Sequence, residues 1–186
     1  MSYSKETTIE SVYAKLTSGH EIRVRDRQEM GLFGWSIEDA LNQLVRTKGV
    51  LLHGTGQRIP AGSKLRLSKA RPRPGSQRVL EGFATDNAGV AILKALFTNQ
   101  TPVGGTRTVN LKYPMHTSDD SPLWLEIQGW HPNVEREHGY VYIFNSMRSF
   151  EKEGDTWQWV TSNDDVTFGG CMEVIRSDFR YPVNRA

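Results

Sequence analysis

The chain has little cysteine and no long apolar run. Its one cysteine, Cys171, excludes an internal disulfide and any zinc site built from several thiolates. Cys171 lies in an apolar stretch, which favours a buried structural thiol over a nucleophile. The apolar runs fall far short of the roughly 20 residues that span a membrane. Residues 1–10 are polar, unlike the start of a signal peptide. We therefore expect a cytoplasmic protein with no membrane partner.

Several catalytic motifs are also missing. The sequence has no Gly-x-x-x-x-Gly-Lys, no Gly-x-Gly-x-x-Gly and no Gly-x-Ser-x-Gly, which removes support for a P-loop, a Rossmann site or a serine hydrolase. None of the five histidines forms a His-x-x-x-His pair on an expected helix, and no acid lies at metal spacing from two of them. We therefore expect no metal.

What is present is typical of one globular α+β domain of 186 residues, with 37% hydrophobic and 24% charged residues. Periodicity predicts two N-terminal helices over 7–17 and 37–48, the second started by Ser36 and Asp39. A third helix, apolar almost all round and therefore buried, is expected after Asp86 and Asn87. About six strands are expected with it, at 50–53, 79–85, 109–115, 123–130, 139–144 and 168–175. We interpret 1–186 as a single domain, with 1–48 a helical elaboration and 49–178 the core.

Positive charge is concentrated in one segment. No Asp or Glu lies between Gln57 and Leu80. Pro72 and Pro74 predict an extended loop there. The segment suits either a solvated loop or a contact with phosphate, DNA or RNA. If the basic loop 58–78 binds phosphate or nucleic acid, the side chains expected to make the contact are Arg66, Lys69, Arg71 and Arg73.

The stretch Gly49-Val-Leu-Leu-His53-Gly54-Thr55-Gly56 is the main candidate for a site. A short apolar strand ends in a histidine, and a turn of small residues follows. Gly54 and Gly56 have no Cβ, so we expect a ligand to approach the backbone closely there. About thirty residues on, Gly82-Phe83-Ala84-Thr85 leads into the apolar helix, and Gly139-Tyr-Val-Tyr-Ile-Phe144 forms a late aromatic strand.

This order of motifs resembles the ADP-ribosyltransferase superfamily, in the branch with a His-Tyr-Glu active site. The small rifampin ADP-ribosyltransferases are similar in size and layout. The resemblance covers roughly residues 48–176. It implies an ADP-ribosyltransferase-like split core of mixed or antiparallel strands with a central buried helix. It also implies NAD as the substrate and no metal.

The resemblance implies a role for each matching residue. His53 would hydrogen-bond a ribose of NAD, the Gly54 backbone would hold the nicotinamide amide, and Thr55 would lie beside it. Phe83 would take the place of the stacking tyrosine, with Thr85 next to it in the site. Gly139 stands where the family's polymerases have their catalytic glutamate. The nearest acids are Glu137 and Glu151, and the small-enzyme layout favours Glu151.

The chemistry of the residues supports the same reaction class. Cleaving a ribose–nitrogen bond builds positive charge on the sugar, which a carboxylate stabilises. Phe83 is equally compatible with an ordinary place in the core. Glu137 and Glu151 are equally compatible with a solvated surface. Two other functions stay open: an N-glycosidic hydrolase acting on nucleic acid bases, as a DNA glycosylase does, and a catalytically degenerate protein that binds nucleotide or nucleic acid. The acceptor and the oligomeric state are left open.

Overall fold

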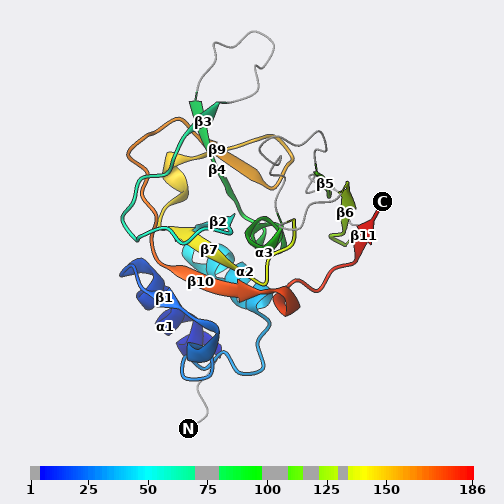
Figure 1. Ribbon diagram of the computed structural model, residues 1–186. Coiled ribbons are helices and arrows are strands. Elements are labelled where there is room, and N and C mark those ends of the chain that lie inside the picture. Colours follow the sequence, from blue (N-terminus) through cyan, green and yellow to red (C-terminus); the bar gives the residue numbers. More distant parts are fainter. Residues whose placement is uncertain (1–4, 70–79, 98–108, 115–121, 130–133) are drawn as a thin grey trace.

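The structure is a computed structural model that describes residues 5–69, 80–97, 109–114, 122–129 and 134–186 (Figure 1). Within these residues it contains three α-helices, a large mixed β-sheet and a smaller three-stranded sheet. The α+β class and the three expected helices are confirmed.

Two of the three α-helices begin where the sequence predicts, and the first begins at Lys5, two residues before its predicted start. The Ser36 side chain accepts a hydrogen bond from the backbone N–H of Asp39, and Asn87 does the same for Val90, so both caps satisfy an otherwise unpaired donor. None of the described helices combines the length and the apolar character needed to cross a bilayer. The α-helices and the short 3-10 helices are α1 (Lys5–Thr17), α2 (Ile37–Lys48), α3 (Ala88–Leu96), η1 (Val24–Asp26), η2 (Met147–Ser149) and η3 (Arg176–Asp178).

The large sheet joins strands from the whole length of the chain. Its strands run in the order β1-β10-β7-β2-β4-β9-β8, and β3 pairs with β4 beside this path. The β1–β10 pair is parallel and the other pairs are antiparallel. These strands are β1 (Glu21–Ile22), β2 (Leu51–Thr55), β3 (Ser68–Lys69), β4 (Leu80–Thr85), β7 (His138–Phe144), β8 (Glu151–Lys152), β9 (Gln158–Thr161) and β10 (Cys171–Ile175).

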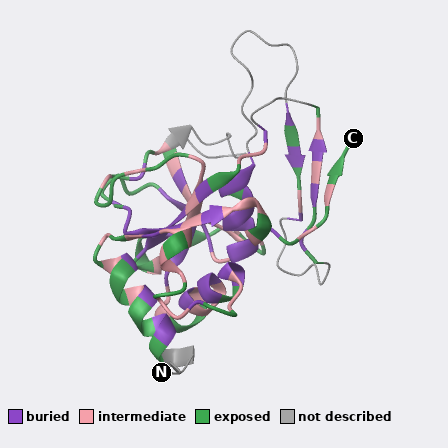
Figure 2. Cartoon of the chain, turned by 60° about the horizontal axis from the view of Figure 1, so that its bottom comes forward, coloured by how far each residue is buried: buried purple, intermediate pink, exposed green. Residues whose placement is uncertain are grey.

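A second sheet has the order β11-β6-β5 and stands to one side of the large sheet (Figures 1 and 2). It consists of β5 (Asn110–Lys112), β6 (Leu125–Gln128) and β11 (Val183–Arg185). We expected only a tail after Tyr181 and Pro182, but this segment forms β11, parallel to β6. The expected count of about six strands is therefore too low. The strands outside that count have two to four residues, which is too short for an alternating pattern to register.

The two faces of the large sheet carry different cores. The main core joins α1, α2 and α3 to one face and includes Leu52, Val141 and Ile143. Every residue of α3 except Lys94 is buried, as its apolar sequence predicts (Figure 2). The opposite face carries a smaller cluster rich in aromatic residues, which we call the aromatic cluster: Leu51, Leu65, Ala84, Tyr142, Phe144, Phe150, Val166, Phe168 and Cys171.

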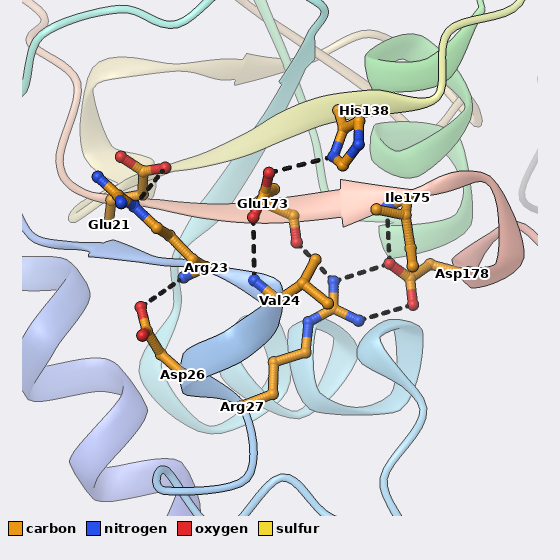
Figure 3. A network of polar contacts seen from close by, with 9 residues as sticks. All are labelled: Glu21, Arg23, Val24, Asp26, Arg27, His138, Glu173, Ile175 and Asp178. Carbon is orange, nitrogen blue, oxygen red and sulfur yellow. Dashed lines mark hydrogen bonds and ion pairs between the residues drawn. The ribbon is translucent and has the colours of Figure 1, made fainter.

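The N-terminal segment is attached to the sheet by a polar network (Figure 3). The Arg27 guanidinium donates two hydrogen bonds to the carboxylate of Asp178, at 2.8 and 2.9 Å, and one to the carbonyl of Glu173, at 2.6 Å. The Glu173 carboxylate accepts a bond from the Val24 N–H at 3.0 Å and also contacts His138. Together with the β1–β10 pairing, these contacts join residues 21–27 to β10 and the η3 turn after it.

Candidate active site

The large sheet opens between β2 and β4. Strand β2 pairs with β7 at every residue from Leu51 to Thr55, but it pairs with β4 only at Leu52 and Thr85. Beyond that pair β4 continues alongside β9 and leaves β2 (Figure 1). His53 is the first residue of β2 past the shared pair. We call this divergence the split, and the candidate site lies at its start.

His53 is held at the split by one hydrogen bond. Its Nδ1 lies 2.9 Å from the carbonyl oxygen of Phe83. A carbonyl can only accept, so Nδ1 carries the hydrogen and Nε2 of the neutral ring is the acceptor. Burial lowers the pKa of His53, the Phe83 carbonyl partly opposes this, and the positive charge of Lys94 lowers it further. No other described residue hydrogen-bonds the ring, so a neutral histidine offers Nε2 to a hydroxyl donor.

Aromatic rings hold the imidazole on its own face of the sheet. The His53 ring centroid lies 5.3 Å from that of Phe168 and 6.2 Å from that of Phe144. Both phenylalanines also line an open cavity of about 570 Å³. His53 therefore contacts the aromatic wall of that cavity. The lining is largely polar and comprises Thr17, Ser18, Gly19, Ala61, Gly62, Phe144, Asn145, Ser146, Ser149, Asp165, Val166, Thr167, Phe168 and Gly169.

Cys171 shares a row of the sheet with His53, through Tyr142 of the intervening strand. The thiol is buried, and burial raises its pKa to about 11. A thiol with so high a pKa is protonated at neutral pH and is a poor nucleophile. The predicted burial of this thiol is confirmed.

The glycines after His53 serve packing. A Cβ on Gly54 would overlap the carbonyl oxygen of Ala91 in α3, and one on Gly139 would overlap that of Ala95. The helix therefore lies directly on β2 and β7. A Cβ on Gly56 would overlap the Arg136 side chain. Protein atoms already fill the space on the Cβ side of both glycines, so a ligand that approaches this backbone has to come from another side.

The Phe83 ring lies on the opposite face of the sheet from His53. Leu52 pairs with Thr85, so these two share a face. Phe83, two residues before Thr85, shares it as well, whereas His53 points to the other face. The structure therefore brings His53 to the backbone of Phe83, not to its ring. Thr85 is buried.

The two threonines predicted to lie in the site make local turns. Thr85 Oγ1 accepts a hydrogen bond from the N–H of Asn87, and Thr55 Oγ1 accepts one from the N–H of Gln57, both at 3.1 Å. Each side chain therefore fixes the exit of its strand. Thr55 nevertheless lies two residues from His53, on the same face of β2.

Neither candidate glutamate contacts His53. Glu151 is exposed on β8, which lies three strands from β2, or about 14 Å at ~4.8 Å per strand. Glu137 is exposed just before β7, five residues from the Tyr142 that faces His53, or up to about 16 Å at ~3.3 Å per residue. In the described part of the chain, no carboxylate hydrogen-bonds the imidazole.

The basic segment is only partly described. Arg66 is exposed, Lys69 belongs to β3, and Arg71 and Arg73 lie outside the described residues. Two further cations of the segment already have acidic partners. Arg58 pairs with Glu21, and Lys64 lies 2.7 Å from Asp165. No group of histidines, cysteines and acids in the described ranges is arranged to hold a metal ion.

Two cations at the split were not predicted from the sequence. Lys94 is the exposed residue of α3 and lies close enough to lower the pKa of His53. Arg136 lies against Gly56. Neither one stands out in the sequence, and Arg136 lies between two glutamates, a pattern typical of a solvated loop. Only the return of the chain from α3 to β7 brings Arg136 beside β2.

Compared with protein-family models, curated proteins and solved structures, the chain matches none of them. The resemblance to ADP-ribosyltransferases therefore depends on the sequence motifs alone.

Proposed function

We propose that the chain binds NAD at the split and cleaves the bond between nicotinamide and ribose, transferring ADP-ribose to an acceptor in the manner of an ADP-ribosyltransferase. The observation that carries the proposal is His53. It is the first residue beyond the last β2–β4 pair, and its Nδ1–H is bound to the Phe83 carbonyl. This arrangement fixes the neutral tautomer whose Nε2 accepts a hydrogen bond. A ribose hydroxyl is a donor of the matching kind.

The split sheet and the helix after β4 also support the proposal. β2 with its His-Gly-Thr end, β4 running into a buried α3, and the later β7 follow one another along the chain in the order that the resemblance implies. The reaction further needs a carboxylate to stabilise the developing charge on the ribose. The proposal gives this role to Glu151 or Glu137, each of which would have to reach the ribose of bound NAD.

A second candidate function is nucleotide binding without catalysis. The observation that favours it is the distance of both glutamates from β2, together with the position of the Phe83 ring on the far face. In this case His53 would bind a ribose and no bond would break.

Incubation with NAD labelled in the nicotinamide separates the two candidates. We expect release of free nicotinamide, and we expect NAD to raise the melting temperature. His53→Ala should weaken NAD binding about tenfold, the effect of one lost hydrogen bond. Glu151→Gln or Glu137→Gln, whichever acid is catalytic, should abolish release and keep binding.

His20→Ala is the control, because His20 is an exposed histidine outside the split. It should behave as the wild type does. A melting shift with no nicotinamide release would select the binding function. Neither shift nor release in the wild-type protein would refute both candidates.

A further inference from the structure

Arg136 is a half-buried arginine whose charge has no partner in the described structure. Its backbone N–H donates to the carbonyl of Leu96 at 2.8 Å, which anchors the residue at the end of α3. Its guanidinium lies against Gly56, at the open end of β2. Among the described residues the guanidinium has neither an ion pair nor a hydrogen bond. Burial alone lowers the pKa of Arg136, with no acid to oppose the shift.

The acids beside Arg136 in the sequence do not neutralise it. Glu135 pairs with Arg176 and Arg185. Glu137 is exposed and makes no ion pair in the described part of the chain. A partly desolvated charge without a partner is unfavourable for the folded protein, so an arginine held in this way is suited to binding an anion from outside.

A guanidinium recognises phosphate and carboxylate through two parallel N–H donors, and phosphate is the form that nucleotides carry. Gly56 lies just past the end of β2, three residues or up to about 10 Å from His53. Side chains alternate between the two faces of a strand, so Arg136 lies on the α3 side of β2 and His53 on the other side. A nucleotide ligand that contacts both side chains therefore passes over the open end of β2. Lys94 adds a second positive charge near His53.

We propose that Arg136 binds a phosphate group of a nucleotide ligand at the open end of the split, with Gly56 supplying the space in which the guanidinium lies. The identity of the ligand as a nucleotide rests on the proposed function. The anion site itself rests on the placement of Arg136.

The test measures binding of two probes, ADP-ribose and inorganic pyrophosphate, by calorimetry. Arg136→Ala should weaken both about 10- to 100-fold, as expected for a charge-assisted hydrogen bond. Arg136→Lys keeps the charge but loses the paired donors, so its affinity should be intermediate. Gly56→Ala keeps the arginine and places a methyl group where the guanidinium lies, so it should reproduce most of the loss.

The matched control is Arg148→Ala. Arg148 is an exposed arginine of η2 whose guanidinium has no partner among the described residues. It should bind both probes as the wild type does. Thermal melts of every variant establish that each one is folded.

Equal binding by the wild type and Arg136→Ala would refute the anion site, whatever the nicotinamide assay shows. Failure of the wild type to bind either probe would refute it as well. Pyrophosphate binding that depends on Arg136, without NAD binding or nicotinamide release, would support the anion site while refuting the proposed function.

Discussion

Three influences set the charge of His53, and one of them opposes the other two. Burial disfavours the imidazolium, and the nearby Lys94 disfavours it further, while the Phe83 carbonyl favours a ring that donates from Nδ1. Because burial is the largest of the three, the pKa lies below the ordinary value of 6.5. The unfolded chain therefore binds a proton at His53 at a higher pH than the folded chain does.

This difference predicts how stability depends on pH. Above pH 6.5 the histidine is neutral in the folded and the unfolded state, so it does not make the free energy of unfolding depend on pH. As the pH falls below 6.5, the unfolded state gains a proton first, so unfolding becomes easier by up to about 1.4 kcal/mol per pH unit until the folded pKa is reached. His53→Gln, which does not titrate, should lack this contribution.

Urea unfolding of both proteins between pH 5 and 8 measures the effect. The free energy of unfolding of the wild type, minus that of His53→Gln, should be constant above pH 6.5 and decrease below it. A difference that stays flat over the whole range would show that the imidazole keeps its ordinary pKa in the folded protein.

At the scale of elements, close packing between α3 and two strands shapes the sheet around the split. Gly54 and Gly139 meet the backbone of α3 at Ala91 and Ala95. With such small residues on both sides, the helix approaches the sheet closely and leaves no room for a methyl group.

We predict that Gly54→Ala destabilises the fold by at least about 1–3 kcal/mol, the usual effect of overpacking a core, because its Cβ would overlap the helix backbone. Gly56→Ala is the matched control on the same strand end. The three atoms nearest its Cβ all belong to the flexible Arg136 side chain, so the effect on stability should stay within about 0.5 kcal/mol. Urea unfolding compares them, and equal stability of the two variants would contradict a backbone contact at Gly54.

Elements with strong local signals could be predicted from the sequence. The caps at Ser36 and Asn87 start α2 and α3 as expected, and the expected strands at 50–53 and 139–144 correspond to β2 and β7. β11 escaped prediction because its strand character comes from its partner β6, more than fifty residues earlier. Local patterns contain no information about such pairing.

The candidate site was predictable only in part, for a related reason. The sequence places His53 at a strand end and Phe83 in the strand before the helix. Which faces their side chains occupy depends on the register of Leu52 with Thr85, and one step of register reverses every side chain. The positions of Glu137 and Glu151 depend likewise on strand order, which the sequence does not specify.

At the scale of the whole molecule, the N-terminal segment is part of the main core. Residues of α1 and α2 share one hydrophobic cluster with α3, and β1 extends the large sheet beside β10. Arg27, directly after η1, donates two hydrogen bonds to Asp178 of η3 and one to Glu173 of β10 (Figure 3). The Arg27 and Asp178 side chains are only 15% and 11% exposed, so the pair is shielded from solvent.

This arrangement predicts that Arg27 stabilises the protein as one cooperative unit. Arg27→Ala leaves the Asp178 carboxylate partly buried without its partner, and it should lower the free energy of unfolding by about 3 kcal/mol. Arg25→Ala is the control. The Arg25 side chain is 75% exposed and lies 3.7 Å from Asp26, a surface pair whose loss should matter by less than about 1 kcal/mol.

Unfolding followed by both tryptophan fluorescence and far-UV circular dichroism completes the test. Trp35 lies in the N-terminal segment, and Trp157 and Trp159 lie late in the core segment 49–178. Hydrophobic packing connects these two parts of the chain. In Arg27→Ala the two signals should therefore shift together to lower urea concentration, as a single transition. Two separate transitions would instead show that residues 1–48 detach before the sheet unfolds, and the N-terminal helices would then be an independent elaboration.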